Sequence, residues 1–283
     1  MSQSVITPWG RGSGPIVMGV LNVTPDSFSD GGAFVDPERA EVQARKLVES
    51  GASIVDVGGE STRPGSKPVT VREELRRVVP VLEEIAPICS SPGVVISIDT
   101  TKADVAECAL RLGATMVNDV SALRFDNRMA EVIKTSEALV CLMHMRGTPG
   151  SMQDDPRYTD VVNEVCVFFE ERIGFAIQRG ISPERICIDP GIGFGKTVEH
   201  NLQLIRNIGQ IAALGYPVVI GASRKSFLGR FLGDPMAGKG SLSASLAVAA
   251  VAYQYGARIF RVHDVREHVE ALRVVSGVRD SAS

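Results

Sequence analysis

Eight short apolar segments recur along this chain, and each ends at or near a polar residue before a stretch with helical periodicity begins. The polar residues are Asn22, Asp56, Asp99, Asn118, His144, Asp189, Ser223, and Arg261 together with His263. Apolar strands that alternate with helices are typical of a parallel sheet covered by helices. Eight such units predict a (β/α)8 barrel, whose catalytic groups lie at the C-terminal ends of the strands. These polar residues therefore mark the expected position of the chemistry.

The length of the chain predicts a single domain. Its 283 residues are close to the roughly 250 that one such barrel requires, and no linker or change of composition divides the range 1–283. Residues 1–15 precede the first strand and are expected to cover the bottom of the barrel. The longer irregular stretches all follow strands and are expected to build the active site: 24–35, 61–69, 145–158, 191–198 and 225–240.

Charge, hydropathy and cysteine usage exclude several classes of protein. A formal net charge of −3 argues against a general nucleic-acid binder, because phosphate neutralisation needs a basic surface. No apolar run approaches the ~20 residues of a membrane span, and the N-terminus lacks the apolar core of a signal peptide. Five cysteines in no CxxC spacing predict neither a disulfide framework nor a zinc site. We therefore expect a cytoplasmic protein with reduced thiols.

Eight motifs follow one another from the first strand to the last. They are 18–32 (MGVLNVTPDSFSDGG), 56–65 (DVGGESTRPG), 97–100 (SIDT), 118–119 (ND), 143–147 (MHMRG), 189–196 (DPGIGFGK), 223–227 (SRKSF) and 261–264 (RVHD). In this order they resemble the dihydropteroate synthase family of pterin-binding barrels. The resemblance covers nearly the whole chain and shows no departure at a motif position.

The resemblance implies a transferase that forms a C–N bond. The family condenses 6-hydroxymethyl-7,8-dihydropterin diphosphate with p-aminobenzoate to give 7,8-dihydropteroate and pyrophosphate, with Mg²⁺ as cofactor, and its members are typically homodimers. A pterin-binding methyltransferase on the same barrel is the alternative, but its donor has no diphosphate and would leave the anion-binding groups without a purpose. A catalytically inactive barrel would be expected to lose some of these groups. A nucleotide loop at 191–197 is rejected, because Pro190 stands where a P-loop needs glycine.

Four residues match the pterin-binding positions of the family. Asp189 can accept two neighbouring ring donors in a two-pronged contact, and Asn118 supplies an acceptor and donors. Asp99 can accept from the remaining donors, and Lys225 can donate to the ring carbonyl. Structural alternatives stay open for both carboxylates: Asp99 could cap the helix that begins near Thr101, and Asp189 could be a turn residue.

Positive charge for the diphosphate is expected from the last strand. Arg261 and His263 alternate there, so their side chains leave the same face. Arginine binds phosphate oxygens in two-pronged fashion, and histidine adds a donor that can carry charge. Together with Lys225 they are the expected catalytic residues, and the resemblance extends the diphosphate site to Val262. By the same resemblance Asn22 is the magnesium ligand, with the other ligands coming from phosphate and water.

The second substrate is expected near the seventh strand. In the family its carboxylate binds where 223–226 precedes a predicted helix, with Ser226 adding a hydroxyl. Thr62, which also belongs to the pterin site, would line a flat aromatic slot with Pro64 and Phe194; a plain core position is the alternative for Phe194. Residues Phe28 and Arg63 come from the two early loops. A sulfonamide copies the flat aniline and should compete for this slot.

The histidines outside the last strand are interpreted as structural. His144 is expected to be a satisfied strand-end residue, and His200 and His268 are expected to be surface groups on helices. The four histidines show no metal-ligand spacing.

Overall fold

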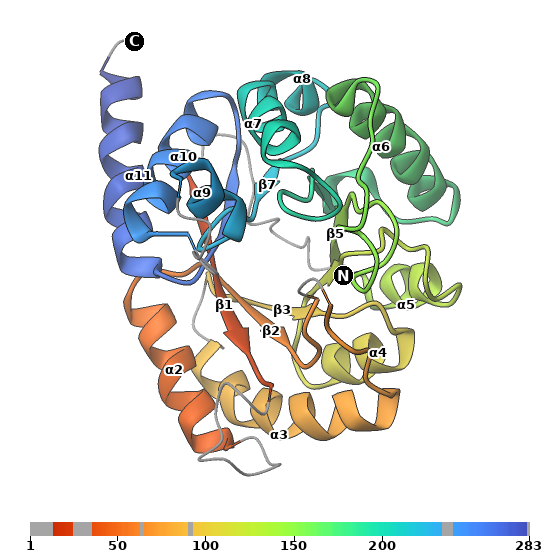
Figure 1. Cartoon of the computed structure of the whole chain (residues 1–283). Coiled ribbons are helices and arrows are strands. Elements are labelled where there is room, and N and C mark those ends of the chain that lie inside the picture. Colours follow the sequence, from red (N-terminus) through yellow and green to blue (C-terminus); the bar gives the residue numbers. More distant parts are fainter. Residues whose placement is uncertain (1–13, 25–35, 63–64, 90–92, 234–239, 282–283) are drawn as a thin grey trace.

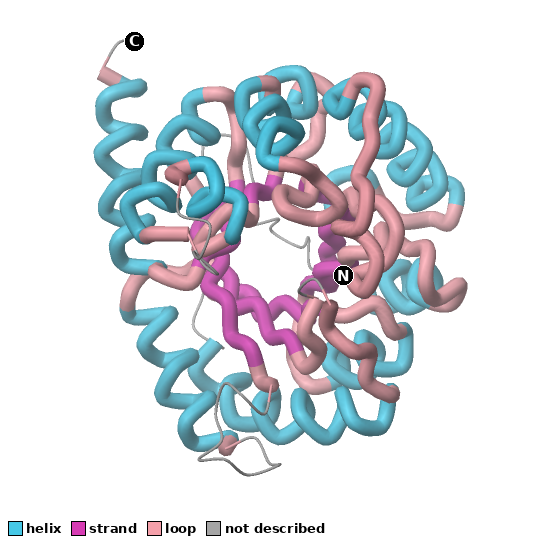
Figure 2. The backbone as a smooth tube through the Cα atoms, in the orientation of Figure 1, coloured by secondary structure: helices cyan, strands magenta, loops and turns pink. Residues whose placement is uncertain are grey.

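The structure, a computed structural model, describes residues 14–24, 36–62, 65–89, 93–233 and 240–281. Parallel strands form the inner ring and helices surround it (Figures 1 and 2). The strands are β1 Ile16–Asn22, β2 Ile54–Gly58, β3 Val95–Asp99, β4 Met116–Asp119, β5 Leu139–Met143, β6 Ile186–Asp189, β7 Val219–Ile220 and β8 Ile259–Val262. The helices are α2 Pro37–Glu49, α3 Val71–Cys89, α4 Ala103–Arg111, α5 Met129–Ser136, α6 Val161–Gln178, α7 Val198–Arg206, α8 Ile208–Ala212, α9 Ser226–Phe231, α10 Leu242–Gln254 and α11 Val265–Asp280, with a short 3-10 helix at Pro183–Arg185.

The strand order confirms the predicted (β/α)8 barrel. The eight-stranded sheet runs β6-β5-β4-β3-β2-β1-β8-β7, and every pair is parallel. A parallel bridge between Ile188 and Val218 brings the two ends of the sheet together. The carboxyl ends of all strands therefore open on one face, where the polar strand-end residues gather.

Helix boundaries follow local side-chain and backbone chemistry. The Asp36 carboxylate accepts the backbone N–H groups of Glu38 and Arg39 at the start of α2. Asp160 does the same for α6, and Ser241 accepts an N–H at the start of α10. At the other end, Gly51 follows α2 with φ of 98°, a left-handed conformation that glycine adopts without a steric penalty. These capping residues begin and end the helices, so that the chain alternates between outer helices and inner strands.

Alternation along the strands separates two apolar layers. Odd-numbered residues of β2, Val55 and Val57, pack outward against the helices, whereas Ile54 packs inward. The inward cluster fills the lower barrel with Ile16, Met18, Ile54, Met116, Leu139, Cys141, Cys187, Val219 and Ile259. The next inward positions, toward the strand ends, are polar. The barrel interior is therefore apolar at its lower end and polar at the C-terminal ends of the strands.

Two expectations about the periphery need a comment. His268 on α11 is buried, and its Nδ1 lies 2.6 Å from the carbonyl oxygen of Asp264, so the prediction of a surface position is wrong. It turns inward because a hydrogen-bond partner one helical turn earlier satisfies its ring. His200 is half-buried and shares a reciprocal cap with Thr197. The predicted roles of Phe28, Arg63, Pro64 and residues 1–13 lie outside the described residues.

Within the described part of the chain, no helix is both long enough and apolar enough to span a membrane.

Candidate active site

A polar layer lines the barrel mouth on the inward faces of the strands. The strand pairing places Gly58 beside Asp99 and Asp99 beside Asn118, while Met143 on β5 lies beside Asp189 on β6. The strand ends predict all three polar residues, and the barrel brings them to the same end of its interior. None of them has more than a small part of its surface exposed.

Arg261 is the central cation of this layer. Its Nε lies 2.7 Å from Asp56 Oδ2 and its Nη2 lies 2.8 Å from Asp99 Oδ2. Asn118 donates its Nδ2 to the same Asp56 oxygen at 3.1 Å. Burial lowers the pKa of Arg261, but the two carboxylates outweigh it and the net direction is upward. We call Asp56, Asp99 and Arg261 the carboxylate cluster.

The carboxylate cluster carries unsatisfied acceptors. Burial raises the pKa of Asp99 to about 7, against the opposing effect of the Arg261 charge. One oxygen of Asp56, one oxygen of Asp99 and the hydroxyl of Ser97 have no hydrogen-bond partner in the structure. The alternative role of Asp99 as a helix cap does not hold, because the first backbone N–H of α4, at Ala103, is taken by Asp126. Asp99 therefore has one buried oxygen without a hydrogen-bond partner.

Asp189 and Lys225 lie close together, because Asp189 Oδ2 and Lys225 Nζ are each 3.7 Å from where a Cβ would stand at Gly221. Asp189 Oδ1 accepts the Gly191 N–H at 2.7 Å, so the residue does form the turn that is its structural alternative. Its second oxygen lies toward Gly221, 3.7 Å from where a Cβ would stand there. Burial raises the pKa of Asp189 and lowers that of Lys225 to about 8, although each charge opposes the shift of the other. One carboxylate thus serves both the turn and the site.

The aromatic slot residue Phe194 lies beside Lys225. The Lys225 amine is 4.5 Å from the centre of the Phe194 ring, and it donates to the carbonyl of Ile192. Phe194 is only partly buried and packs against the cluster of Val120, Met143, Met145 and Met152. Its ring therefore lines the cavity wall and is not a plain core position.

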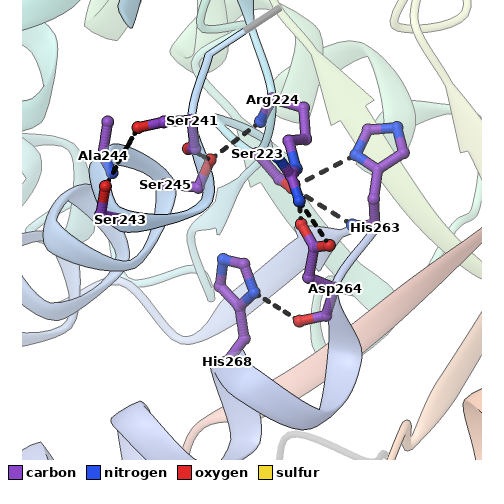
Figure 3. Close-up of polar contacts among 9 residues, drawn as sticks. All are labelled: Ser223, Arg224, Ser241, Ser243, Ala244, Ser245, His263, Asp264 and His268. Carbon is purple, nitrogen blue, oxygen red and sulfur yellow. Dashed lines mark hydrogen bonds and ion pairs between the residues drawn. The ribbon is translucent and has the colours of Figure 1, made fainter.

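The three expected diphosphate residues, Arg261, Val262 and His263, do not all face the barrel interior. His263 is exposed just beyond β8, and its Nδ1 lies 3.2 Å from the Ser223 hydroxyl, which also accepts the His263 backbone N–H (Figure 3). Val262 is buried in the outer apolar layer, so its side chain faces away from the cavity and only its main chain can reach a ligand. The Arg261 side chain, 21% exposed, reaches the cavity from below.

Arg224 turns away from the cavity. It has φ of 59°, a conformation rare outside glycine, and its Nε and Nη2 each lie 2.8 Å from an Asp264 oxygen (Figure 3). Its N–H donates to the Ser245 hydroxyl at 3.0 Å. This fork fixes the turn that brings Lys225 and Ser226 to the start of α9, the helix predicted there.

The remaining predicted contacts of p-aminobenzoate are half-buried. Ser226 is the first residue of α9, and its hydroxyl lies 3.0 Å from Arg230 Nη2. Thr62 lies beyond the end of β2 on the same rim. Both therefore have surface available for a small ligand.

A metal would find few protein donors here. Among the described residues, no group of three or more His, Cys, Asp or Glu side chains could hold a metal ion. Asn22 Oδ1 and Asp99 Oδ2 lie 3.8 and 3.7 Å from the position of a Cβ at Gly58. Asp99 Oδ2 is already paired with Arg261, which leaves the Asn22 oxygen for a cation that takes its other ligands from phosphate and water.

The sequence assigns no binding or catalytic role to two residues of the site. Asp56 is fully buried between Val55 and Val57, and a carboxylate inside an apolar strand was the available signal. Lys196 is also buried and lies 2.9 Å from His144 Nδ1, which makes His144 the satisfied strand-end residue that the sequence predicts. No sequence signal distinguishes this lysine from a surface one.

Comparisons with known proteins match this geometry. A family model described as "Pterin binding enzyme" matches residues 18–263, which defines the class of the barrel and its site. Dihydropteroate synthase from Escherichia coli strain K12 is 46% identical over 263 residues, covering 93% of this chain and 91% of the relative. The Synechocystis enzyme is 42% identical over 270 residues, covering 95% and 91%.

Solved structures agree. A Yersinia pestis dihydropteroate synthase in a sulfonamide drug complex has a TM-score of 0.85 at 40% identity, with 95% of each chain covered. The Xanthomonas albilineans enzyme with 4-aminobenzoic acid has a TM-score of 0.85 at 42% identity, with 94% of each covered. The chain belongs to the dihydropteroate synthase family.

Proposed function

We propose that the chain is a transferase that condenses 6-hydroxymethyl-7,8-dihydropterin diphosphate with p-aminobenzoate, releasing pyrophosphate and 7,8-dihydropteroate. The observation that carries this is the convergence of Asp99, Asn118, Asp189 and Lys225 at one end of the barrel interior. Family membership and relatives solved with 4-aminobenzoic acid and 7,8-dihydropteroate support it.

The pterin would lie flat in the polar layer. Asp189 presents one oxygen toward the cavity while Gly191 holds the other, which suits a ring edge with adjacent donors. Asn118 is fixed by Asp56, and Asp99 offers an acceptor without a partner. Lys225 would donate to the ring carbonyl. A ligand lacking these groups would leave buried polar atoms unpaired, so the layer selects a pterin.

Departure of the diphosphate would depend on Arg261 and His263. Two of the five N–H donors of Arg261 bind Asp56 and Asp99, so the others are available to phosphate oxygens without breaking the carboxylate cluster. His263 would add a donor at the rim. We assign Mg²⁺ to this end, with Asn22 as its protein ligand; when bound, it supplies positive charge to the leaving group.

The arylamine would attack from the slot lined by Thr62 and Phe194, with Ser226 near its carboxylate. An aniline is neutral at pH 7, so positioning and leaving-group electrostatics account for the rate without a strong general base. A sulfonamide would compete with p-aminobenzoate for the same slot.

We also propose that the enzyme acts as a homodimer. Exposed apolar side chains gather on α10, on the residue after it, and on α11, and a second copy of this chain would cover them: Val251, Tyr255, Val274 and Val278. Sedimentation at micromolar concentration tests this, and a monomer would contradict it.

The decisive experiment for the reaction is pyrophosphate release from the dihydropterin diphosphate, with and without p-aminobenzoate. We expect stoichiometric pyrophosphate and dihydropteroate only when both substrates are present. Release that ignores p-aminobenzoate would indicate a hydrolase instead.

A further inference from the structure

Lys196 is a buried residue at the end of the loop that follows β6. It is 2% exposed, and its Nζ lies 2.9 Å from His144 Nδ1, 2.9 Å from the Phe194 carbonyl oxygen and 3.4 Å from the His144 carbonyl oxygen. These partners are neutral, unlike the carboxylates that bind Arg261. The amine therefore connects the end of β5 to the main chain of the loop after β6.

This loop, residues 191–195, is pressed against the segment that follows β5. A Cβ at Gly191 would stand 1.9 Å from the His144 carbonyl oxygen, and one at Gly195 would stand 2.8 Å from the Arg146 carbonyl oxygen. Both glycines have positive φ, 67° and 63°. Only glycine fits at these two contacts, so the loop has one way to pack.

Side-chain donors then bind the loop carbonyls in turn. Gln153 Nε2 donates to Gly193 at 2.7 Å, and the Tyr158 hydroxyl donates to Gly195 at 2.9 Å. Lys196 donates to the carbonyl between them, that of Phe194. With its carbonyl bound on the buried side, Phe194 is held while its ring packs at the cavity wall beside Lys225.

We propose that Lys196, held by His144, is a positioning residue for the arylamine substrate: it fixes the main chain at Phe194 and thereby the shape of the aromatic slot. The identity of the substrate rests on the proposed function, whereas the fixing of the Phe194 main chain by Lys196 does not. Because Lys196 acts through Phe194 and not through the pterin edge, removing it should affect one substrate more than the other.

Burial changes the pKa values of both Lys196 and His144. It lowers the pKa of Lys196 well below 10.5 and lowers that of His144 well below 6.5. Lys196 Nζ and His144 Nδ1 are 2.9 Å apart, so one nitrogen donates and the other accepts, according to the tautomer of His144. His144 is further held by the rings of Phe168 and Tyr158 at 4.8 and 6.1 Å between centroids.

The test is Lys196→Met, with the exposed Lys134→Met as the matched control. We expect the KM for p-aminobenzoate to rise roughly tenfold or more while the KM for the pterin diphosphate stays within about twofold, since a lost contact of about 1.4 kcal/mol is a tenfold effect. Tyr158→Phe removes the hydrogen bond from the tyrosine hydroxyl to the Gly195 carbonyl. It should also raise the KM for p-aminobenzoate, but by less than Lys196→Met does.

His144 provides the rescue. His144→Asn keeps an acceptor near the position of Nδ1 and should retain most of the p-aminobenzoate affinity, whereas His144→Leu should match Lys196→Met. The double variant Lys196→Met/His144→Leu should be no worse than either single change, because both break one unit. An equal rise in both KM values would overturn the proposal and leave Lys196 a supporting role in the fold.

Hydrogen exchange separates this inference from the proposed function. Amides of 192–195 should exchange faster in Lys196→Met than in the wild type, whatever the protein catalyses. Unchanged exchange would overturn the positioning role. Faster exchange in an enzyme that releases no pyrophosphate would overturn the proposed reaction and, with it, the arylamine as the ligand of the slot.

Discussion

Arg261 and Lys196 are both basic residues at the barrel mouth, and their surroundings are opposite. Arg261, at β8, contacts two carboxylates from β2 and β3 and keeps its charge. Lys196, after β6, contacts a ring nitrogen and two carbonyl oxygens, and burial lowers its pKa. A buried charge is stable when an opposite charge offsets its desolvation, and otherwise the group tends toward its neutral form.

The contrast separates two kinds of work in one site. The carboxylate cluster holds a permanent charge where a diphosphate must bind, which suits electrostatic stabilisation. The Lys196 side holds a loop in one conformation, which suits shape recognition of a flat aromatic ring. Substitutions can alter the carboxylate cluster and the surroundings of Lys196 separately. The first should affect charge stabilisation and the second the shape of the aromatic slot.

Replacing Arg261 by Ala should have the largest effect on stability. It leaves Asp56 and Asp99 buried without their cation, a type of loss worth about 3–5 kcal/mol in the free energy of unfolding. Burial holds the folded pKa of Asp99 above its unfolded value, at about 7 even with Arg261 present, so its contribution to stability is retained at acidic pH and lost as pH rises through that value.

Urea unfolding at pH 5 and pH 8 measures this, and the loss should be larger at pH 8. Arg261→Lys, which keeps the charge, is the control and should lose less. An equal loss of unfolding free energy at both pH values would mean that water already solvates the carboxylates. Arg261 would then not differ from Lys196 in having its charge offset by buried carboxylates.

Replacing Asp189 by Ala should weaken pterin binding by roughly 30- to 1000-fold, equivalent to about 2–4 kcal/mol. The change removes the acceptor that faces the cavity and leaves ring donors unpaired. Calorimetric titration with a pterin fragment lacking phosphates measures the loss. Undiminished binding by a folded variant would assign Asp189 to the Gly191 turn alone.

The charge of Lys225 should set the alkaline limb of the pH profile. Because its pKa is lowered to about 8, the amine loses its charge as pH rises through that value, and kcat/KM for the pterin diphosphate should fall by up to about tenfold per pH unit above it. In Lys225→Arg the guanidinium stays charged, so the limb should move to higher pH. A limb that does not move would belong to another group.

Stability against pH sharpens the contrast for Lys196. Its folded pKa lies below its unfolded value, so the unfolded chain binds more protons and wild-type stability should rise with pH toward 10.5, by at most about 1.4 kcal/mol per pH unit. Lys196→Met should lack that rise, while Lys134→Met should keep it. Parallel unfolding curves for all three proteins between pH 7.5 and 9.5 would show that Lys196 stays charged, like Arg261.

The sequence alone determined the barrel and the edge where its chemistry lies. Strand periodicity and polar strand ends need only neighbouring residues, so the sequence was enough to place Asp99, Asn118 and Asp189 at one end of the barrel, and the family resemblance added Lys225. The same rule placed Arg261 and His263 at the last strand. The helix predicted in the apolar segment 227–231 also followed from local sequence, and in the structure it begins one residue earlier, at Ser226.

Only the tertiary structure decided which partners these groups have. Arg261 and Asp56 are 205 residues apart, and barrel closure alone brings them within 2.7 Å. His268 has helical neighbours typical of a surface residue, yet it packs inward, and Lys196 looks like any polar residue after a glycine loop. Periodicity fixes the face from which a side chain leaves its own element, but burial and charge depend on which distant elements pack against it.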